Sequence, residues 1–454
     1  MLILCYSENG YTLRGHYYAR TGDNCPLKNK AVQDKSNPWY RLDNAAKLYP
    51  AIRNRKWMSI FRVSVLLNEP VKPLVLQEAL ETTLARIPSF ALKMRTGFFW
   101  YYFEPNPRKP LVQEDVQNPC MRFTKANRGY LFRVRYYNRR IALEVFHAVT
   151  DGTGAMTFLK TLTAEYLRLM GHKIPAGEGI LDPAKDSKAG EMEDAFSRYA
   201  RFKAHHSRKE SKAYSVRGTV EPMLNLNITT GLIPLERITP MAKKQGVSLT
   251  EFIVAMLLIS LNKVQLAEGN RRLRPVKVSV PVNLRKYYES ESLRNFSMFV
   301  NPGIDPNFGE YTLEEVCQLV HHFLRYEMTE KHLNARLARN VQSERNPVVR
   351  AMPLFAKNAA IRMIFHYTGE SRFTSTFSNI GIVSVPEEMK KYVERFDFVL
   401  GPSRYNRVNC TATSYGGTLA LTFSRVIREA MVEREFFTML VKMGVPVKIE
   451  SNQE

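Results

Sequence analysis

Apolar and polar positions follow two different periods in the first half of this chain. The segment WMSIFRVSVLL (57–67) alternates in the manner of a β-strand, and 74–87 carries apolar residues at helical spacing. GFFWYYFEP (97–105) is again strand-like, and 130–147 indicates two strands around a tight turn near Asn138. Strand and helix patterns therefore mix here without a regular alternation.

The second half opens with a helix signal. Ser248 and Glu251 form an S-x-x-E capping box ahead of an apolar run, so a buried helix is predicted to begin at Leu249. Four valines occupy alternate positions from 276 to 282 and predict a strand that ends near Arg285.

The remaining patterns are two helical regions and a hairpin. A long charged helix is predicted over 313–340, and a basic, apolar helical pattern over 348–365 is interrupted by Pro353. A hairpin turning at Gly416 and Gly417 precedes a closing helix over 433–443. Because strands and helices do not alternate regularly, we expect an α+β fold with mainly antiparallel or mixed sheets.

The length of 454 residues favours more than one domain. Residues 1–36 are polar and without a sustained period, which is typical of a loosely ordered extension. We expect an N-terminal lobe over 37–172 and a C-terminal lobe over 219–454. Lys, Glu, Ser, Asp and Gly dominate 173–218 between them, which indicates a crossover linker.

A net charge of +23 favours an anionic partner, such as a phosphorylated cofactor, an acidic carrier protein or an anionic membrane. Its basic clusters are short, RNRKW (53–57) and RRLR (271–274), and no nucleic-acid-binding signature accompanies them, so no nucleic acid partner is predicted. The five cysteines are scattered along the sequence, and this pattern predicts reduced cysteines that serve in packing. No transmembrane segment or secretion signal is recognised, and we expect a cytoplasmic protein.

One short stretch carries candidate chemistry. His147 stands where a strand pattern runs out, and Asp151 and Gly152 follow within five residues before a helix begins. A neutral imidazole there suits general-base work, because its ordinary pKa lies near 6.5. Asp151 could orient the imidazole, bind a metal with it or hold the loop through a salt bridge elsewhere, although no third metal ligand is evident, so no metal is expected. Gly152 is expected to permit a turn that a side chain would obstruct.

The stretch HAVTDG resembles the H-x-x-x-D-G motif of the acyl-CoA-dependent acyltransferase superfamily. That superfamily includes chloramphenicol acetyltransferase, alcohol acetyltransferases, polyketide-associated acyltransferases and the condensation domains of peptide synthetases. The resemblance covers about 37–445, and the stretches that agree in order are RLDNAAKLYP, GVSLTEFIVAMLL, VSVPVNLR, RNFSMFVNP and TSTFSNIG. It implies two lobes of chloramphenicol-acetyltransferase topology, with mixed sheets flanked by helices and an active-site tunnel between the lobes.

The same resemblance assigns roles to residues. His147 would be the general base that deprotonates an acceptor for direct attack on a thioester, without an acyl-enzyme. Asp151 would be structural and pair with Arg285. TSTFSNIG is the candidate source of an oxyanion donor, with Ser378 preferred over Thr376 and Asn379; a polar strand edge without a role is the alternative.

At two places the sequence differs from motifs that particular branches of the superfamily carry. Condensation domains carry a second histidine where Phe146 stands, and the D-F-G-W-G signature of plant-type acyltransferases is absent, although RFDFVLGP (395–402) occupies a comparable place. In detail the stretches that agree in order look closest to the alcohol acetyltransferase-like branch, so the resemblance implies an enzyme that moves an acyl group from acyl-CoA to a small alcohol or amine. Acyl-CoA would be a co-substrate, with no cofactor bound permanently.

Two alternatives stay open at this point. The donor could be a thioester on an acidic acyl carrier protein, as in a condensation reaction. In another class, the chain could be a non-catalytic two-lobe protein that binds an anionic lipid, a membrane surface or a partner. The basic stretch RNPVVRAMPLFAKNAAIRMIF (345–365) would then be its contact.

Overall fold

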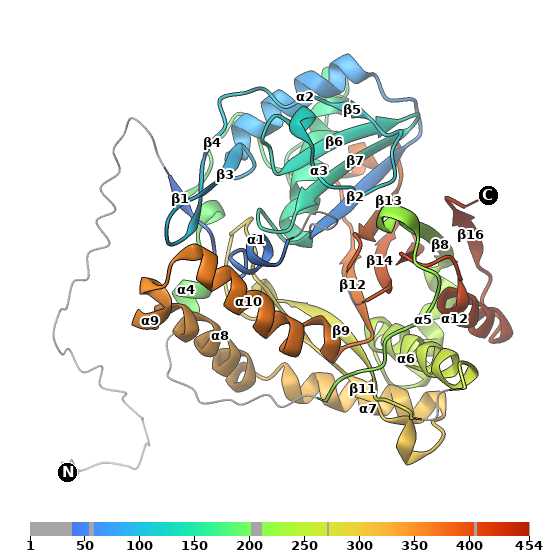
Figure 1. The fold of residues 1–454 in the computed structure, drawn as a ribbon. Helices are drawn as coiled ribbons and strands as arrows, with labels where there is room; N and C mark the ends of the chain where they lie inside the picture. Colours follow the sequence, from blue (N-terminus) through green and yellow to red (C-terminus); the bar gives the residue numbers. More distant parts are fainter. Residues whose placement is uncertain (1–38, 54–58, 201–210, 270–271, 404–405, 454) are drawn as a thin grey trace, which may run out of the picture. The chain divides into compact units, whose positions relative to one another are not determined.

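The computed structural model describes residues 39–53, 59–200, 211–269, 272–403 and 406–453. The predicted extension over 1–36 lies outside these ranges. Within them the chain has the α+β, two-lobe architecture that the sequence predicts, with two mixed sheets and helices packed against them (Figure 1).

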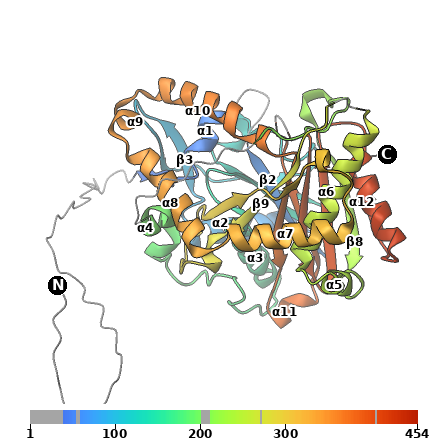
Figure 2. The ribbon, with the colours of Figure 1, turned by 90° about the horizontal axis from the view of Figure 1, so that it is seen from below.

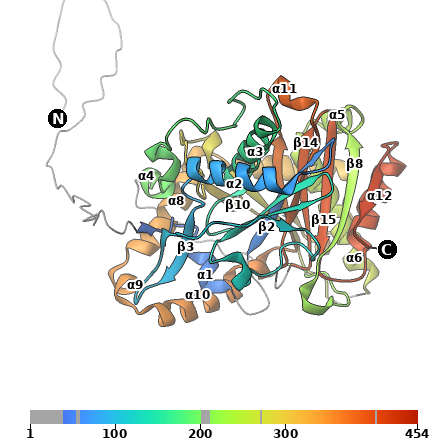
Figure 3. The same cartoon turned by 90° about the horizontal axis from the view of Figure 1, so that it is seen from above.

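The first lobe is built on a five-stranded sheet in the order β13-β2-β7-β6-β5. β2, β7 and β6 form its antiparallel centre, and helices α2 and α3 pack on each other, with α3 against β2 and β7 (Figure 3). The bounds are β2 Ile60–Leu67, β5 Gln113–Glu114, β6 Phe132–Tyr137, β7 Arg140–Phe146, β13 Val393–Leu400, α2 Pro73–Arg86 and α3 Gly152–Leu169. A small sheet lies beside it, with β1 Tyr40–Arg41, β4 Tyr101–Pro105 and β3 Leu92–Thr96 in that order.

The second lobe is built on an eight-stranded sheet in the order β10-β9-β12-β14-β15-β8-β16, with β11 also paired to β9. Helix α6 packs on β9, and α5, α7 and α12 surround it (Figure 2). The strand bounds are β8 Asn227–Pro234, β9 Val276–Asn283, β10 Ser297–Val300, β11 Gly303–Ile304, β12 Ser375–Ile382, β14 Val408–Tyr415, β15 Thr418–Arg425 and β16 Lys448–Ser451. The helix bounds are α5 Leu235–Lys244, α6 Leu249–Ala267, α7 Leu313–Glu327 and α12 Met431–Lys442.

The predicted signals of the second half are confirmed at two places. Ser248 and Glu251 form the reciprocal capping box, and α6 begins at Leu249. The hairpin of β14 and β15 turns at Gly416 and Gly417, both of which have positive φ values that favour glycine. Helix α6 is long and apolar enough to cross a membrane, but 72% of its most apolar window is buried inside the protein, which is typical of a core helix.

The predicted long helix over 313–340 is two helices, because the chain turns at Met328 and Thr329. Helix α7 ends at Glu327, and α8 (Glu330–Arg345) begins after Thr329, whose backbone is extended. Two further helices follow, α9 (Pro347–Ala351) and α10 (Leu354–Thr368), on either side of Pro353. Short helices α1 (Leu48–Ile52), α4 (Ala195–Tyr199) and α11 (Glu387–Lys390) complete the set, and α10 packs on α1.

One strand departs from the predicted division into an N-terminal and a C-terminal lobe. β13 lies within the predicted C-terminal lobe, yet it pairs antiparallel with β2 and forms an edge of the first sheet. Phe396 and Phe398 of β13 are buried in the core of the first lobe. The chain then returns to the second sheet through β14, so the predicted C-terminal lobe contributes a strand to its neighbour.

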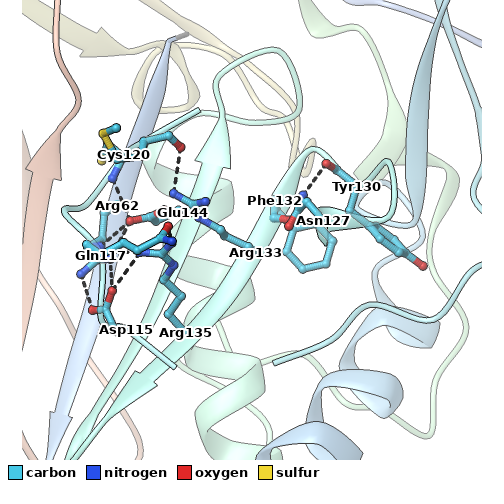
Figure 4. Close-up of polar contacts among 11 residues, drawn as sticks. Arg62, Asp115, Gln117, Cys120, Asn127, Tyr130, Phe132, Arg133, Arg135 and Glu144 are labelled. Atoms are coloured by element: carbon cyan, nitrogen blue, oxygen red, sulfur yellow. Dashed lines mark hydrogen bonds and ion pairs between the residues drawn. The ribbon is translucent and has the colours of Figure 1, made fainter. Parts of the chain in front are cut away.

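A buried group of ion pairs lies on the first sheet (Figure 4). Glu144 of β7 is fully buried, and its Oε1 accepts hydrogen bonds from Nε and Nη2 of Arg62 at 2.9 and 2.6 Å. Arg133 binds its other oxygen, and Asp115 accepts from Arg62 at 2.6 Å and from Arg135 at 3.1 Å. Burial alone would raise the pKa of Glu144, but the three arginines together lower it to about 2.

Candidate active site

His147 follows the last residue of β7, in the turn that leads to α3. Its backbone N–H donates to the carbonyl of Ser59 at 2.8 Å, which extends the pairing of β7 with β2 by one position. The half-buried imidazole stacks on the ring of Tyr49, with centroids 4.6 Å apart and planes 17° apart, and meets the edge of Phe61 at 5.0 Å. Packing on two sides therefore fixes the plane of the imidazole.

Asn295 fixes which imidazole nitrogen carries the proton. The imidazole Nδ1 lies 3.0 Å from Oδ1 of Asn295, and Nδ2 of Asn295 donates to the buried carboxylate of Asp43 at 3.3 Å. Because the amide must present its NH₂ to Asp43, its oxygen faces His147 and accepts from Nδ1–H. The remaining nitrogen, Nε2, is then unprotonated and can act as a base. Burial lowers the pKa of His147, which keeps the ring neutral at pH 7.

Asp43 is the buried end of this chain of contacts. It is fully buried, accepts a hydrogen bond from the backbone N–H of Ala46 at 2.6 Å and lies 3.5 Å from Nε of Arg294. Burial raises the pKa of Asp43 to about 6, against the opposing charge of Arg294. Sequence reasoning singled out neither Asp43 nor Asn295, although both lie in stretches that support the resemblance, RLDNAAKLYP and RNFSMFVNP.

Asp151 and Arg285 are brought together. Arg285 Nη1 lies 2.8 Å from Oδ2 of Asp151, which also accepts from the backbone N–H of Phe296 at 2.9 Å. The other oxygen caps α3 by accepting from Gly154 N–H at 3.2 Å. Of the three roles open to Asp151, the geometry shows the salt bridge that holds the loop, since Asn295 is the group that contacts the imidazole. No cluster of metal-ligating side chains occurs in the described part of the chain.

The prediction that a side chain at Gly152 would obstruct the turn is wrong, and the position that requires glycine is Gly154. Gly152 is the first residue of α3, and an added Cβ would meet nothing closer than Ile380 Cγ1 at 3.8 Å. At Gly154 an added Cβ would lie 2.1 Å from Thr150 Oγ1 and 2.2 Å from the carbonyl oxygen of Leu293. The helix here lies directly against the segment that leads to Asn295.

Substitution of these two glycines by alanine is expected to change stability by different amounts. Gly154→Ala should destabilise the protein by about 1–3 kcal/mol, because the methyl group overlaps the Leu293 backbone, which is held by the Thr150 hydroxyl at 2.5 Å. Gly152→Ala should change stability by less than about 1 kcal/mol, since the position is open and helical. Thermal unfolding midpoints of the two variants test this, and equal losses would contradict the assignment.

The three oxyanion candidates lie on β12 and do not share one direction. Ile380 reaches Gly152, and Thr376 and Ser378 alternate onto the same side of the strand, toward the first lobe, while Phe377 is buried in the second core. Both Thr376 and Ser378 are half-buried. Ser378 therefore lies on the side of β12 that faces the loop after His147.

Asn379 is engaged elsewhere. Its Nδ2 donates to the hydroxyl of Thr250 at 3.0 Å, and its Oδ1 accepts from the backbone N–H of Gly381 at 2.7 Å. Those contacts direct its amide toward the start of α6. Of the three candidates, Asn379 is thus placed least well to reach a group bound at His147.

Comparison with solved structures identifies the fold. No protein-family model matches the sequence, and no curated protein matches it. The first condensation domain of the calcium-dependent antibiotic synthetase, in complex with a substrate analogue, is 15% identical, with a TM-score of 0.58 over 89% of this chain and 96% of that one. Polyketide synthase associated protein 5 from Mycobacterium tuberculosis is 13% identical, with a TM-score of 0.57 over 89% and 97%.

An acetyltransferase is among the similar structures as well. Trichothecene 15-O-acetyltransferase from Fusarium sporotrichioides is 14% identical, with a TM-score of 0.54 over 89% of this chain and 94% of that one. The chain therefore has the chloramphenicol-acetyltransferase-like, two-lobe fold that condensation domains and this acetyltransferase share. At these identities the similarity establishes the fold.

Proposed function

We propose that this protein is an acyltransferase that moves an acyl group from a thioester to an alcohol or amine, with His147 as the general base. The observation that carries the proposal is the Asp43–Asn295–His147 arrangement, which leaves Nε2 as the basic nitrogen. Nε2 takes the proton of the acceptor, whose oxygen or nitrogen attacks the thioester carbonyl carbon. The tetrahedral intermediate then expels the thiolate, which takes the proton back from His147.

The oxyanion of that intermediate needs a hydrogen-bond donor, and we assign this role to Ser378. Its side of β12 faces the His147 loop, and its hydroxyl makes no hydrogen bond to any residue in the described ranges. A well-placed donor contributes about 2.7–4 kcal/mol to such an intermediate. Arg285 and Asp151 hold the loop across the two lobes and do not touch the reacting atoms in this scheme.

Two thioester donors fit the proposal equally. Acyl-CoA would be the donor if the protein acts like an acetyltransferase. A thioester on an acidic acyl carrier protein would be the donor if it acts like the condensation domains of the same fold. Either donor would be attracted by a chain of net charge +23. We propose acyl-CoA first, because the second motif histidine of condensation domains is replaced by Phe146.

The test is thiol release from acetyl-CoA and longer acyl-CoAs, assayed with a panel of small alcohols and amines. Release that depends on the acceptor would support acyl transfer. If no acyl-CoA reacts, the same panel is offered a thioester loaded on an acyl carrier protein. Failure of both donors with every acceptor would overturn the proposed transfer.

A second candidate function, lipid-surface binding, is favoured by one observation. Helices α9 and α10 present Val348, Phe355 and Met363 to solvent at 71, 76 and 63% exposure, and the basic residue Arg350 of α9 is exposed as well. Exposed apolar side chains among basic ones fit an anionic membrane surface. Co-sedimentation with anionic vesicles, in a protein inactive with both donors, would favour this function, and no binding would exclude it.

The rate of transfer is expected to fall on acidification. Burial places the pKa of His147 below its ordinary 6.5, so kcat/KM should decrease as the pH drops through a midpoint under 6.5. Protonation of Asp43, which has a pKa of about 6, should also lower kcat/KM, because it weakens the hydrogen bond that Asp43 accepts from Asn295. A pH–rate profile measures this; a midpoint above 6.5 would contradict the assignment.

Asn295 is expected to act as a positioning residue. Asn295→Ala removes the acceptor of Nδ1–H, so kcat should fall up to about 100-fold with KM little changed. The hydrogen bond that the imidazole Nδ1–H donates to Asn295 also favours the charged imidazole, and its loss should move the acid limb of the profile to lower pH. A lower rate with an unmoved acid limb would indicate a merely structural role.

A further inference from the structure

A cavity of about 470 Å³ lies in the second lobe, away from His147. It is lined by four arginines, Arg217, Arg272, Arg274 and Arg407, and no carboxylate is among the described residues that line it. Arg274 lies just before β9, and Arg407 directly before β14. Because β12 runs parallel to both β9 and β14, the three strands begin at the same end of the sheet (Figure 1).

The backbone around the cavity is held in place by several hydrogen bonds. Gln265, near the end of α6, accepts from the N–H of Arg274 and donates to its carbonyl, both at 2.9 Å. The backbone N–H of Tyr214 donates to the carbonyl of Pro275 at 2.9 Å. The cavity therefore has a formed wall from which the arginine side chains extend.

The charges in this cavity are unbalanced. Glu268, behind the wall, accepts from Tyr214 Oη at 2.6 Å and lies 3.8 Å from Arg217 Nε, so it offsets one guanidinium. Arg407 donates to the neutral carbonyl of Gly218 at 3.3 Å. Within the described residues, the guanidinium groups of Arg272 and Arg274 have no hydrogen-bond or ion-pair partner. Like charges gathered in one cavity repel each other until an anion enters.

We propose that this cavity is a binding site for phosphate groups. Guanidinium groups bind phosphate oxygens through paired, charge-assisted hydrogen bonds, and a cavity with several arginines and no carboxylate selects such an anion. Among the described residues that line it, the only ring is that of the buried Tyr214, whose hydroxyl donates to Glu268, so the phosphates and not an aromatic base are the recognised group.

The site is separate from the proposed catalytic centre. Asn283, at the far end of β9, binds Thr153 of α3 at 3.2 Å and so marks the end near His147. Strand β9, from Val276 to Asn283, spans roughly 23 Å at about 3.3 Å per residue, and Arg274 lies before its first residue. The phosphates could belong to a CoA-type donor that reaches His147 from this end, or to a separate small molecule.

Isothermal titration of the full chain with inorganic pyrophosphate, at constant ionic strength, tests the proposal without needing catalysis. Wild type should bind saturably, and the variant carrying Arg272→Gln and Arg274→Gln should bind at least tenfold more weakly. The matched control carries Lys243→Gln and Lys244→Gln, which remove the same charge from an exposed turn of α5, and should bind within twofold of wild type. Arg272→Gln alone should give an intermediate loss.

Equal weakening in the arginine variant and the lysine control would show attraction by net charge only and would overturn the site. Absence of saturable binding to wild type would overturn it too. With binding established, competition of pyrophosphate against acyl-CoA in thiol release assigns the phosphates to the donor. Binding without competition assigns them to a separate phosphorylated molecule. A protein inactive in acyl transfer that still binds pyrophosphate would separate failure of the proposed function from failure of this site.

Discussion

Replacing His147 by alanine is expected to lower kcat/KM for acyl transfer by about 10²- to 10⁴-fold, the range that general-base catalysis contributes. The substitution removes the nitrogen that accepts the acceptor's proton, and no other histidine in the described ranges contacts Asn295 or Tyr49. The measurement is acceptor-dependent thiol release, compared with wild type under the same conditions. Thermal unfolding of the variant checks that the fold is kept.

His172 offers a matched control for this substitution. It too stacks on a tyrosine, with its ring 4.2 Å from that of Tyr392, and its Nδ1 lies 3.0 Å from the Tyr392 hydroxyl. It stands at the end of α3 that is remote from the motif. His172→Ala should cost comparable packing but leave acyl transfer unchanged; if both variants lose activity alike, His147 is not the base.

Replacing Glu144 by glutamine is expected to destabilise the protein by about 3–5 kcal/mol, because it leaves buried guanidinium groups without their carboxylate. Arg62 and Arg135 would then share Asp115, Arg133 would lose the carboxylate it binds, and the amide NH₂ of glutamine would face their donors (Figure 4). Chemical unfolding of variant and wild type measures the loss.

An exposed ion pair beside the same sheet provides the comparison. Glu394 of β13 binds Arg139 at 2.8 Å, and the two side chains are 42% and 39% exposed, respectively. Glu394→Gln should therefore change stability by less than about 1 kcal/mol. Equal effects of the two substitutions would show that burial of Glu144 does not set the energy of its ion pairs.

The pH dependence of stability supplies a further check on Glu144. Its folded-state pKa of about 2 is below the ordinary value of 4.5, so its contribution is fully present above pH 4.5 and is lost as the pH falls toward 2. The Glu144→Gln variant should lack this contribution. The stability difference between the two proteins should therefore shrink over that interval of pH.

Local patterns predicted much of the fold because they depend on neighbouring residues in the chain. Alternating valines predicted β9, the Ser248 capping box predicted the start of α6, and paired glycines predicted the turn between β14 and β15. Such local patterns did not predict which strands pair when the strands are distant in the sequence. β13 joins the first sheet because its apolar residues find their partners on β2, which no local period indicates.

The sequence by itself determined the motif: a histidine at the end of a strand, an aspartate four residues later, and an arginine at the end of a distant strand. Only the tertiary structure decided which groups act on the imidazole. Asp43 and Asn295 are 252 residues apart and meet His147 only after the two lobes pack together. The physical reason is that hydrogen bonds require contact within about 3 Å, a distance set by packing rather than by separation along the chain.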